Sequence, residues 1–216
     1  MRYLFFLLLY IWTLPVLKAQ DMAAFFISMP NENILQLEEA WRKDLVDLYR
    51  SGKPATLDNT MQGRSTLLKL TPDYLLLQST ERSTVEIKFL PLINNTFIAC
   101  VITTVSAPVA DSRVEFFTTD WKPLDASGIW SPATADRFVK ENADKQDADF
   151  RDAVSSLDIT LIHYRLNVDD ATLTAEYTTP AYLSLEDREM VKPFLKESPI
   201  VYQWKTGRFE NENNLP

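Results

Sequence analysis

The pattern of apolar and polar residues along the chain predicts four β-strands in succession between Tyr74 and Thr119. Apolar residues gather there in short runs, and turn-forming residues separate these runs at near-regular intervals. Such spacing is typical of an antiparallel meander, in which each strand pairs with the next one. The predicted strands span residues 74–78, 85–89, 96–105 and 114–117, and the turns lie at residues 80–82, 94–95 and 107–112.

The second and third of these strands differ in how their apolar residues are arranged. Residues 85–89 alternate between apolar side chains and the charged side chains of Glu86 and Lys88. This alternation predicts a strand with one buried face and one face in water. Residues 97–102 are apolar at every position, so both faces of this strand must be covered, and we predict it in the centre of the sheet.

Before the meander, apolar residues recur every three or four positions, which predicts an α-helix from about Asn33 to Ser51. A glycine and then a proline follow shortly afterwards, and these residue types commonly end a helix. Glu38 stands four residues before Arg42, the favourable order for an ion pair on a helix surface. Residues 22–29 are also apolar and fit either a strand or a short helical turn.

The remaining segments add further strands and short helices. Strands are predicted at residues 55–59, 65–70, 159–167, 172–178 and 200–204, and helices at residues 134–140, 144–157 and 184–192, followed by a polar tail from Gly207. Ser184 and Asp187 stand at the spacing of a capping box, which marks the start of the last helix. We therefore predict an α+β fold, an antiparallel β-sheet meander with helices packed on one face. The order of elements is also compatible with a fold of two similar halves, each made of a helix followed by strands.

The first 19 residues have the features of a secretory signal peptide. Arg2 precedes an apolar run from Leu4 to Leu17, and Ala19 is a small residue suited to signal peptidase. The run falls short of the roughly 20 residues that a membrane span needs. We expect cleavage after Ala19 and export to the periplasm or the medium, with residues 20–216 forming one domain that has no stable membrane anchor.

The charge balance narrows the choice of partners. Removing Arg2 and Lys18 from the 22 basic residues leaves 20 against 30 acidic residues, a formal charge of −10. Nucleic acids and anionic lipids are bound through clustered Lys and Arg, and the sequence contains no such cluster. We therefore expect no nucleic-acid partner.

The single cysteine and the single histidine are weak candidates for chemistry. Cys100 lies within the fully apolar strand, where burial raises the pKa of a thiol and so opposes activation. His163 stands in a predicted strand without a cysteine or carboxylate at metal-ligand spacing. From these residues we predict no catalytic residue, no metal site and no cofactor, and we interpret both as structural.

Pairs of carboxylates keep one class of enzyme open. Glycoside hydrolysis needs two carboxyl groups about 5 to 9.5 Å apart across a cleft. Asp111 and Asp120 flank one predicted strand, and Asp169 and Asp170 occupy a predicted hairpin. Turn residues in water explain the same pattern, so a carboxylate-dependent hydrolase is our alternative hypothesis.

The segment from Asp120 to Pro132 lacks a strand pattern yet contains Trp121 and Trp130. Such a loop either packs onto the core or presents aromatic rings that stack on a sugar or anchor a protein partner. Residues 123–133 are also the place where the domain would subdivide. The candidate ligand- or partner-binding residues are Asp111, Arg113, Asp120, Trp121 and Trp130.

Four blocks of sequence stand out together, namely STLLKLTPDYL at 65–75, VSAPVADSR at 105–113, TTDW at 118–121 and YTTPAYL at 177–183. In combination they resemble a family of exported Bacteroidales proteins that contain a domain of unknown function. The resemblance covers nearly the whole chain after the predicted signal peptide. It implies export from such bacteria, and it implies neither an activity nor catalytic residues.

We favour a binding module without catalytic activity, which recognises a protein or a glycan through loops at one end of the sheet. The loops around residues 111–113 and 120–121 carry this hypothesis because they combine charge with an aromatic ring. Besides the hydrolase, a structural subunit of an envelope assembly is a further alternative, which would require a large exposed apolar patch.

Overall fold

The computed structural model describes residues 21–94 and 96–211. Within them, the first sheet contains β1 (Thr56–Asp58), β2 (Arg64–Leu70), β3 (Tyr74–Thr80), β4 (Ser83–Pro91), β5 (Phe97–Ser106) and β6 (Ala110–Phe117). The second sheet contains β7 (Ile162–Leu166), β8 (Thr172–Tyr177), β9 (Ile200–Lys205) and β10 (Arg208–Asn211). The helices are α2 (Met22–Ile27), α3 (Glu39–Arg50), α4 (Ala148–Ser155), α5 (Thr179–Tyr182) and α6 (Leu185–Val191).

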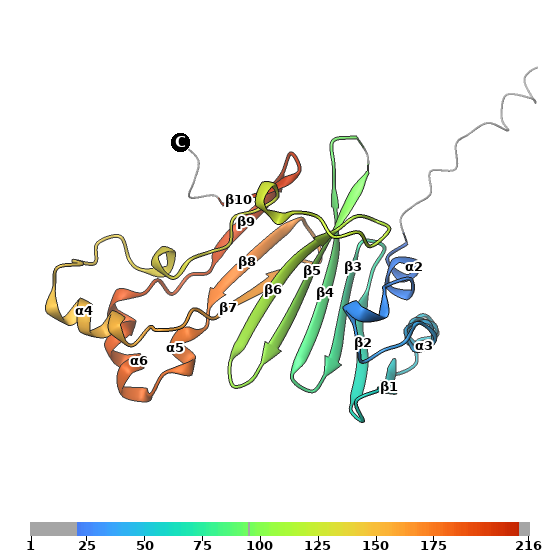
Figure 1. The fold of residues 1–216 in the computed structure, drawn as a ribbon, viewed down its shortest axis with the longest axis horizontal. Helices are drawn as coiled ribbons and strands as arrows, with labels where there is room; N and C mark the ends of the chain where they lie inside the picture. The colour runs from blue at the N-terminus through green and yellow to red at the C-terminus, as the bar shows by residue number, and fades with distance from the viewer. Residues whose placement is uncertain (1–20, 95, 212–216) are drawn as a thin grey trace, which may run out of the picture.

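The six-stranded sheet is a meander in which every strand pairs antiparallel with the next one along the chain. The predicted α+β fold on an antiparallel meander is confirmed. β5 lies between β4 and β6, and its residues 98–102 are buried, as the uninterrupted apolar run predicts. The four-stranded sheet is also antiparallel, and it lies on the β6 side of the first sheet (Figure 1).

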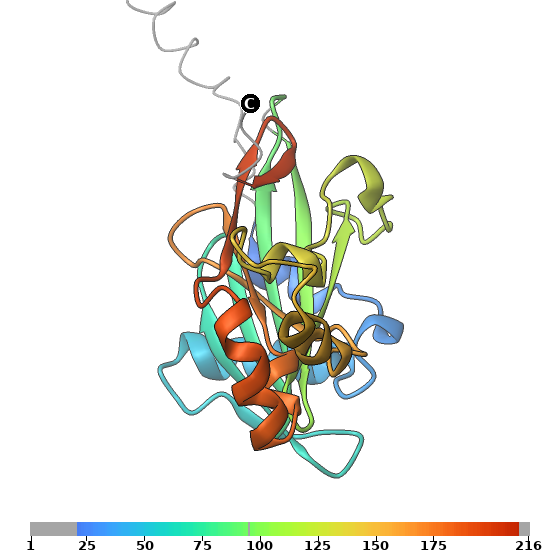
Figure 2. The ribbon, with the colours of Figure 1, turned by 90° about the vertical axis from the view of Figure 1, so that its left-hand side faces the viewer.

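The two faces of the first sheet are covered by different elements. Helices α2 and α3 cover one face, toward β1 to β3 (Figure 1), where Phe26 and Leu45 pack with Leu75 in one apolar cluster. The second sheet covers the opposite face, where Cys100 and Tyr164 belong to another cluster. Helices α4, α5 and α6 gather at one end of the molecule (Figure 1), and this end faces the viewer in Figure 2.

The charged residues of β4 are buried, so the prediction that this strand faces water on one side is wrong. Glu86 is 6 % exposed and Lys88 is 2 % exposed. Lys88 Nζ donates to the carbonyl oxygen of Val168 at 2.9 Å and pairs with Asp73 at 3.2 Å. The second sheet covers this face, and its backbone supplies the polar partners that water would otherwise provide.

Helix α3 begins at Glu39, well after the predicted start at Asn33. The cause is Arg42, which is buried and therefore does not form the predicted ion pair on the helix surface. Its guanidinium donates to backbone carbonyls of Ile27, Met29 and Leu37 and to the side chain of Asn31. The chain before α3 wraps around this group, and the short 3₁₀ helix η2 (Asn31–Asn33) forms there.

Other boundaries differ from the prediction by smaller amounts. The helix expected at 144–157 is shortened to α4, and a 3₁₀ helix, η4 (Ala135–Phe138), replaces the one expected at 134–140. Of the two alternatives left open for residues 22–29, the helical one is observed, as α2 (Met22–Ile27). The predicted start of the last helix at Ser184 is confirmed, since Ser184 is the N-cap of α6 and its Oγ accepts from the Asp187 N–H at 3.1 Å. The predicted signal peptide lies outside the described residues.

The expected polar tail from Gly207 instead begins with a strand. Thr206 and Gly207 have φ values of 49° and 90°, and this left-handed pair closes a two-residue turn between β9 and β10. Threonine seldom adopts this conformation, so the turn carries little sequence signal. β10 pairs with β9, and Phe209 is buried between the sheets.

Candidate functional site

Three of the five candidate residues line one cavity of about 430 Å3, which we call the β6 cavity. It is bounded by the chain just after α2, by β4, β5 and β6, and by Trp121. Asp111 and Arg113 lie on β6 two positions apart, so their side chains project from the same face. Arg113 stands opposite Thr103 of β5, which in turn stands opposite Val85 of β4. The register of the meander therefore places residues of β4, β5 and β6 side by side, and these residues form the floor of the cavity.

The β6 cavity has an apolar floor and a charged rim. Val101, Phe117 and Trp121 belong to the apolar cluster beneath α2 and α3. The charged side chains that line it are the carboxylates of Glu32, Asp111 and Glu115 and the guanidinium of Arg113. Arg113 pairs with Glu115 on the same strand. Three acids thus stand against one base, and the cavity has a negative rim.

Trp121 belongs to the core, and its ring faces are occupied by other side chains. Phe25 stacks on it with ring centroids 4.0 Å apart and planes at 13°, and Phe117 lies 5.3 Å away. Its indole N–H donates to the carbonyl oxygen of Phe25 at 3.0 Å. With 7 % of its surface exposed, Trp121 has no free ring face on which a sugar could stack.

Asp111 and Asp120 have different surroundings. Asp111 Oδ1 accepts a hydrogen bond from the backbone N–H of Ile162 at 3.1 Å, which joins β6 to β7. Asp120 is exposed, and Lys122 at 2.7 Å and the hydroxyl of Thr118 stabilise its carboxylate. These two contacts hold the pKa of Asp120 below its usual value. Asp120 is not among the residues that line the β6 cavity.

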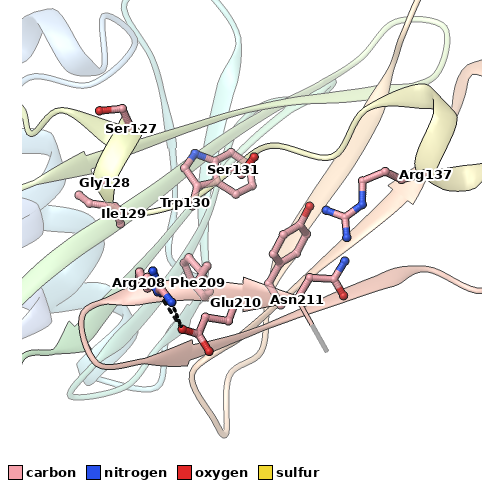
Figure 3. Close-up of a pocket in the computed structure, with 11 residues that line it drawn as sticks. Ser127, Gly128, Ile129, Trp130, Ser131, Arg137, Arg208, Phe209, Glu210 and Asn211 are labelled. Carbon is pink, nitrogen blue, oxygen red and sulfur yellow. Dashed lines mark hydrogen bonds and ion pairs between the residues drawn. The ribbon is translucent and has the colours of Figure 1, made fainter. Parts of the chain in front are cut away.

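Trp130 lines a second cavity, of about 410 Å3, which we call the Trp130 cavity (Figure 3). The loop at residues 127–131, the side chain of Arg137 and the β9–β10 hairpin enclose it. Trp130 is buried, and its ring packs edge-on against Tyr164 at 5.0 Å and Tyr202 at 5.9 Å. The structure therefore separates Trp130 from the other candidates, because the two cavities share no lining residue.

Arg137 and Tyr202 are site residues that the sequence patterns did not indicate. Arg137 lies in η4, and its guanidinium carbon is 6.0 Å from the centroid of the Tyr202 ring. Burial raises the pKa of the Tyr202 hydroxyl, and the nearby positive charge of Arg137 opposes this shift. Neither residue belongs to a motif, so only the tertiary structure reveals that they meet.

Glu86, Cys100 and His163 are titratable groups that line neither cavity. Burial raises the pKa of Glu86, whose carboxyl group accepts from the Tyr74 hydroxyl at 3.1 Å and the Leu166 N–H at 3.0 Å. Cys100 is fully buried, which raises the pKa of its thiol, as predicted. His163 is half-buried in β7, and burial lowers its pKa.

The described part of the chain has neither a cluster of metal-ligating side chains nor a helix suited to a membrane. No group of three or more His, Cys, Asp or Glu side chains is placed there to hold a metal ion. Among the helices at residues 21–94 and 96–211, none has the length and apolarity needed to cross a membrane.

Comparison with known proteins identifies relatives without an assigned activity. A family model described as a protein of unknown function (DUF3256) matches residues 15–209. A solved structure, a domain of an uncharacterized protein from Porphyromonas gingivalis W83, is 29 % identical with a TM-score of 0.81. The match covers 90 % of this chain and 100 % of that one. No curated protein matches the chain.

Proposed function

The chain belongs to the DUF3256 family of proteins of unknown function, and we propose that it is a binding domain without catalytic activity. Its ligand is a segment of a partner protein that carries basic and apolar side chains and occupies the β6 cavity. We also propose that the domain acts after export, in the periplasm or outside the cell, where it meets this partner. The observation that carries the proposal is the combination of an apolar floor with a rim of carboxylates.

The apolar part of the site comes from the region of the sheet that α2 and α3 leave open. Val105 of β5 lines the cavity and is 48 % exposed, next to the buried floor formed by Val101 and Phe117. A partner that covers an exposed apolar side chain beside a cavity removes apolar surface from water, and this burial stabilises the complex. This surface favours an apolar side chain of the partner.

The charges on the rim favour a basic partner. Glu32, Asp111 and Glu115 come from two separate segments and surround the apolar floor. Arg113 is the single basic residue among the lining residues, and it is already paired with Glu115. Complementary charges steer association and suppress wrong partners, so Lys or Arg of the partner would face these carboxylates.

A protein segment fits this site better than a glycan. Sugars are held by aromatic rings that offer an open face, and both Phe25 and Phe117 pack against the ring of Trp121. The hydrolase alternative needs a carboxyl group with a raised pKa inside a cleft. Among the described residues, Glu86 is the carboxyl group with a resolved upward shift, and it lies between the sheets.

The proposed envelope subunit would need a continuous apolar surface for its neighbours. The exposed large apolar side chains of the described residues come instead from separate elements, such as Leu68 on β2, Val105 on β5 and Leu185 on α6. The observations therefore favour a small recognition site over an extended assembly surface.

The test begins with a random peptide library displayed on phage and selected against the protein. Selected peptides are then measured by calorimetry against the wild type and against Val105→Lys, which places a positive charge beside the floor. The matched control is Leu68→Lys, because Leu68 lies in the same sheet, is 47 % exposed and does not line the cavity.

We expect the selected peptides to combine Lys or Arg with aliphatic residues. Val105→Lys should weaken their binding at least about tenfold through charge repulsion and lost apolar contact, which corresponds to about 1.4 kcal/mol. Leu68→Lys should leave the affinity unchanged. Peptides that bind Val105→Lys as tightly as the wild type would show that the β6 cavity is not the binding site.

A further inference from the structure

We propose that the Trp130 cavity is a second binding site, which takes a carboxylate attached to a ring-sized body. It shares no lining residue with the β6 cavity, so this proposal and the proposed function at the β6 cavity are tested independently. The inference rests on three features of the cavity: an arginine and a buried hydroxyl that have no carboxylate partner and no hydrogen-bond partner, respectively, within residues 21–94 and 96–211, and apolar walls.

The guanidinium of Arg137 is available to an anion. Arg137 is half-buried, and among the described residues no carboxylate lies within ion-pair distance of it. Its side chain points into the cavity toward Asn211 (Figure 3). A guanidinium presents a planar fork of N–H donors that matches the two oxygens of a carboxylate. In a chain with a formal charge of −8, a half-buried arginine without such a partner indicates a site for an anion.

The hydroxyl of Tyr202 supplies a second unused polar group. Tyr202 lines the cavity and is 2 % exposed, and its hydroxyl has no hydrogen-bond partner among the described residues. Nearly all buried polar groups in folded proteins are hydrogen-bonded, so such a hydroxyl needs an explanation. A ligand oxygen held by the neighbouring Arg137 guanidinium would provide the missing partner.

Apolar side chains form the walls and favour a ligand with a ring. Ile129, Trp130 and Phe209 line the cavity, and the last two belong to the core between the sheets. At the mouth, Arg208 pairs with Glu210, and the side chain of Arg208 is exposed. A volume of about 410 Å3 lies within the usual range for small-ligand sites and accommodates a six-membered ring with its carboxylate.

Two sources of this chemistry are an acidic sugar and an aromatic acid. Both place a carboxylate on a ring with a flat or partly apolar face, which suits an arginine surrounded by aromatic residues. Glucuronate and benzoate are therefore the probes for the full-length chain. Glucose and benzamide keep the rings and lack the charge, whereas acetate and phosphate keep the charge and lack the ring.

Binding is measured by calorimetry and by the NMR shift of the Trp130 indole N–H. We expect glucuronate or benzoate to saturate the site and to shift this resonance, with acetate, phosphate and the neutral rings at least tenfold weaker. Tighter binding of glucuronate identifies an acidic sugar as the source, and tighter binding of benzoate identifies an aromatic acid.

Two substitutions test the proposed contacts. Arg137→Met removes the charge and keeps the aliphatic length, and we expect it to weaken binding at least tenfold. Tyr202→Phe removes only the hydroxyl, and we expect a loss of three- to tenfold. The control is Arg64→Met, since Arg64 is an exposed arginine of β2 outside the cavity, and its loss should leave binding unchanged.

Thermal melting of each variant shows whether it is folded before its binding is compared. Unchanged binding by folded Arg137→Met would overturn the proposal, as would equal weakening by Arg64→Met. If Arg137→Met does not fold, Tyr202→Phe decides the question, and unchanged affinity in that variant would also overturn it. The proposal fails as well if neither glucuronate nor benzoate binds, or if acetate and phosphate bind equally well.

Discussion

The Glu86 carboxyl group accepts a hydrogen bond at 3.0 Å from the backbone N–H of Leu166, a residue 80 positions further along the chain. The N–H groups of Ile162 and Tyr164 donate in the same way to Asp111 and Ser112 of β6. Side-chain oxygens of the first sheet thus satisfy alternate N–H groups along one edge of β7. An edge strand with unpaired N–H groups invites association with other chains, and this arrangement removes that risk.

Glu86→Ala should destabilise the fold by about 3 kcal/mol. The substitution leaves the Leu166 N–H and the Tyr74 hydroxyl buried without an acceptor, and each unpaired group costs about 1–3 kcal/mol. Glu86→Gln retains an acceptor oxygen and should cost about 1 kcal/mol or less. Urea denaturation gives both values, and an equal effect of the two substitutions would contradict the role assigned to these hydrogen bonds.

Stability should depend on pH through Glu86. Burial raises the pKa of its carboxyl group above the ordinary value of 4.5, so the folded state holds the proton more tightly than the unfolded chain. Its contribution is therefore complete below pH 4.5 and is lost as the pH rises through the raised pKa. Hydrogen bonds from Leu166 and Tyr74 and the charge of Arg165 oppose this shift without cancelling it.

Glu86→Gln isolates this contribution because glutamine does not titrate. The free energy of unfolding of the wild type minus that of Glu86→Gln should fall as the pH rises above 4.5. Urea denaturation across a pH series measures this difference, and Glu32→Gln, at an exposed position, is the control. A difference that stays constant or increases with pH would mean that burial does not raise the pKa of Glu86 in the folded protein.

Arg42→Met should cost about 3 kcal/mol or more, because the carbonyls of Ile27, Met29 and Leu37 lose the donor that they share. Arg50→Met on the same helix should cost less than about 1 kcal/mol, since the Arg50–Asp21 pair is exposed. Thermal melting compares the two variants. Hydrogen exchange of α2 and η2 should also accelerate in Arg42→Met, and unchanged exchange there would contradict this anchoring role.

Trp121→Ala should destabilise the protein by about 3–5 kcal/mol, as expected for the loss of a large core side chain. Trp121→Phe keeps a ring against Phe25 but leaves the carbonyl oxygen of Phe25 without its donor, so we expect a loss of about 1–2 kcal/mol. Denaturation curves measure both losses. A loss below about 0.5 kcal/mol in Trp121→Ala would indicate that this tryptophan serves a surface function instead.

Much of the fold was predictable because its signals are local. Each predicted strand of the meander is present, since alternation, apolar runs and short turns act on neighbouring residues. The capping of α6 by Ser184 is equally local. The start of α3 was not predictable, because it depends on the interior position of Arg42 and on carbonyls that follow α2.

The candidate site was predictable only in part. Asp111 and Arg113 share a strand face, and Trp121 follows the same strand, so their shared cavity accords with their closeness in sequence. Trp130 lies elsewhere because the loop that carries it crosses to the second sheet. Arg137 and Tyr202 are far apart in sequence, and their meeting depends on how that sheet packs.

The local order of apolar residues is sufficient to predict the antiparallel meander, the central position of β5 and the buried surroundings of Cys100. Which charged residues are buried depends instead on how the two sheets pack. Glu86 and Lys88 have the alternation of a strand that faces water, yet the second sheet covers them and supplies backbone partners from residues 166 and 168. A strand's own pattern cannot specify a partner about 80 residues away, because that contact forms only when the two sheets pack.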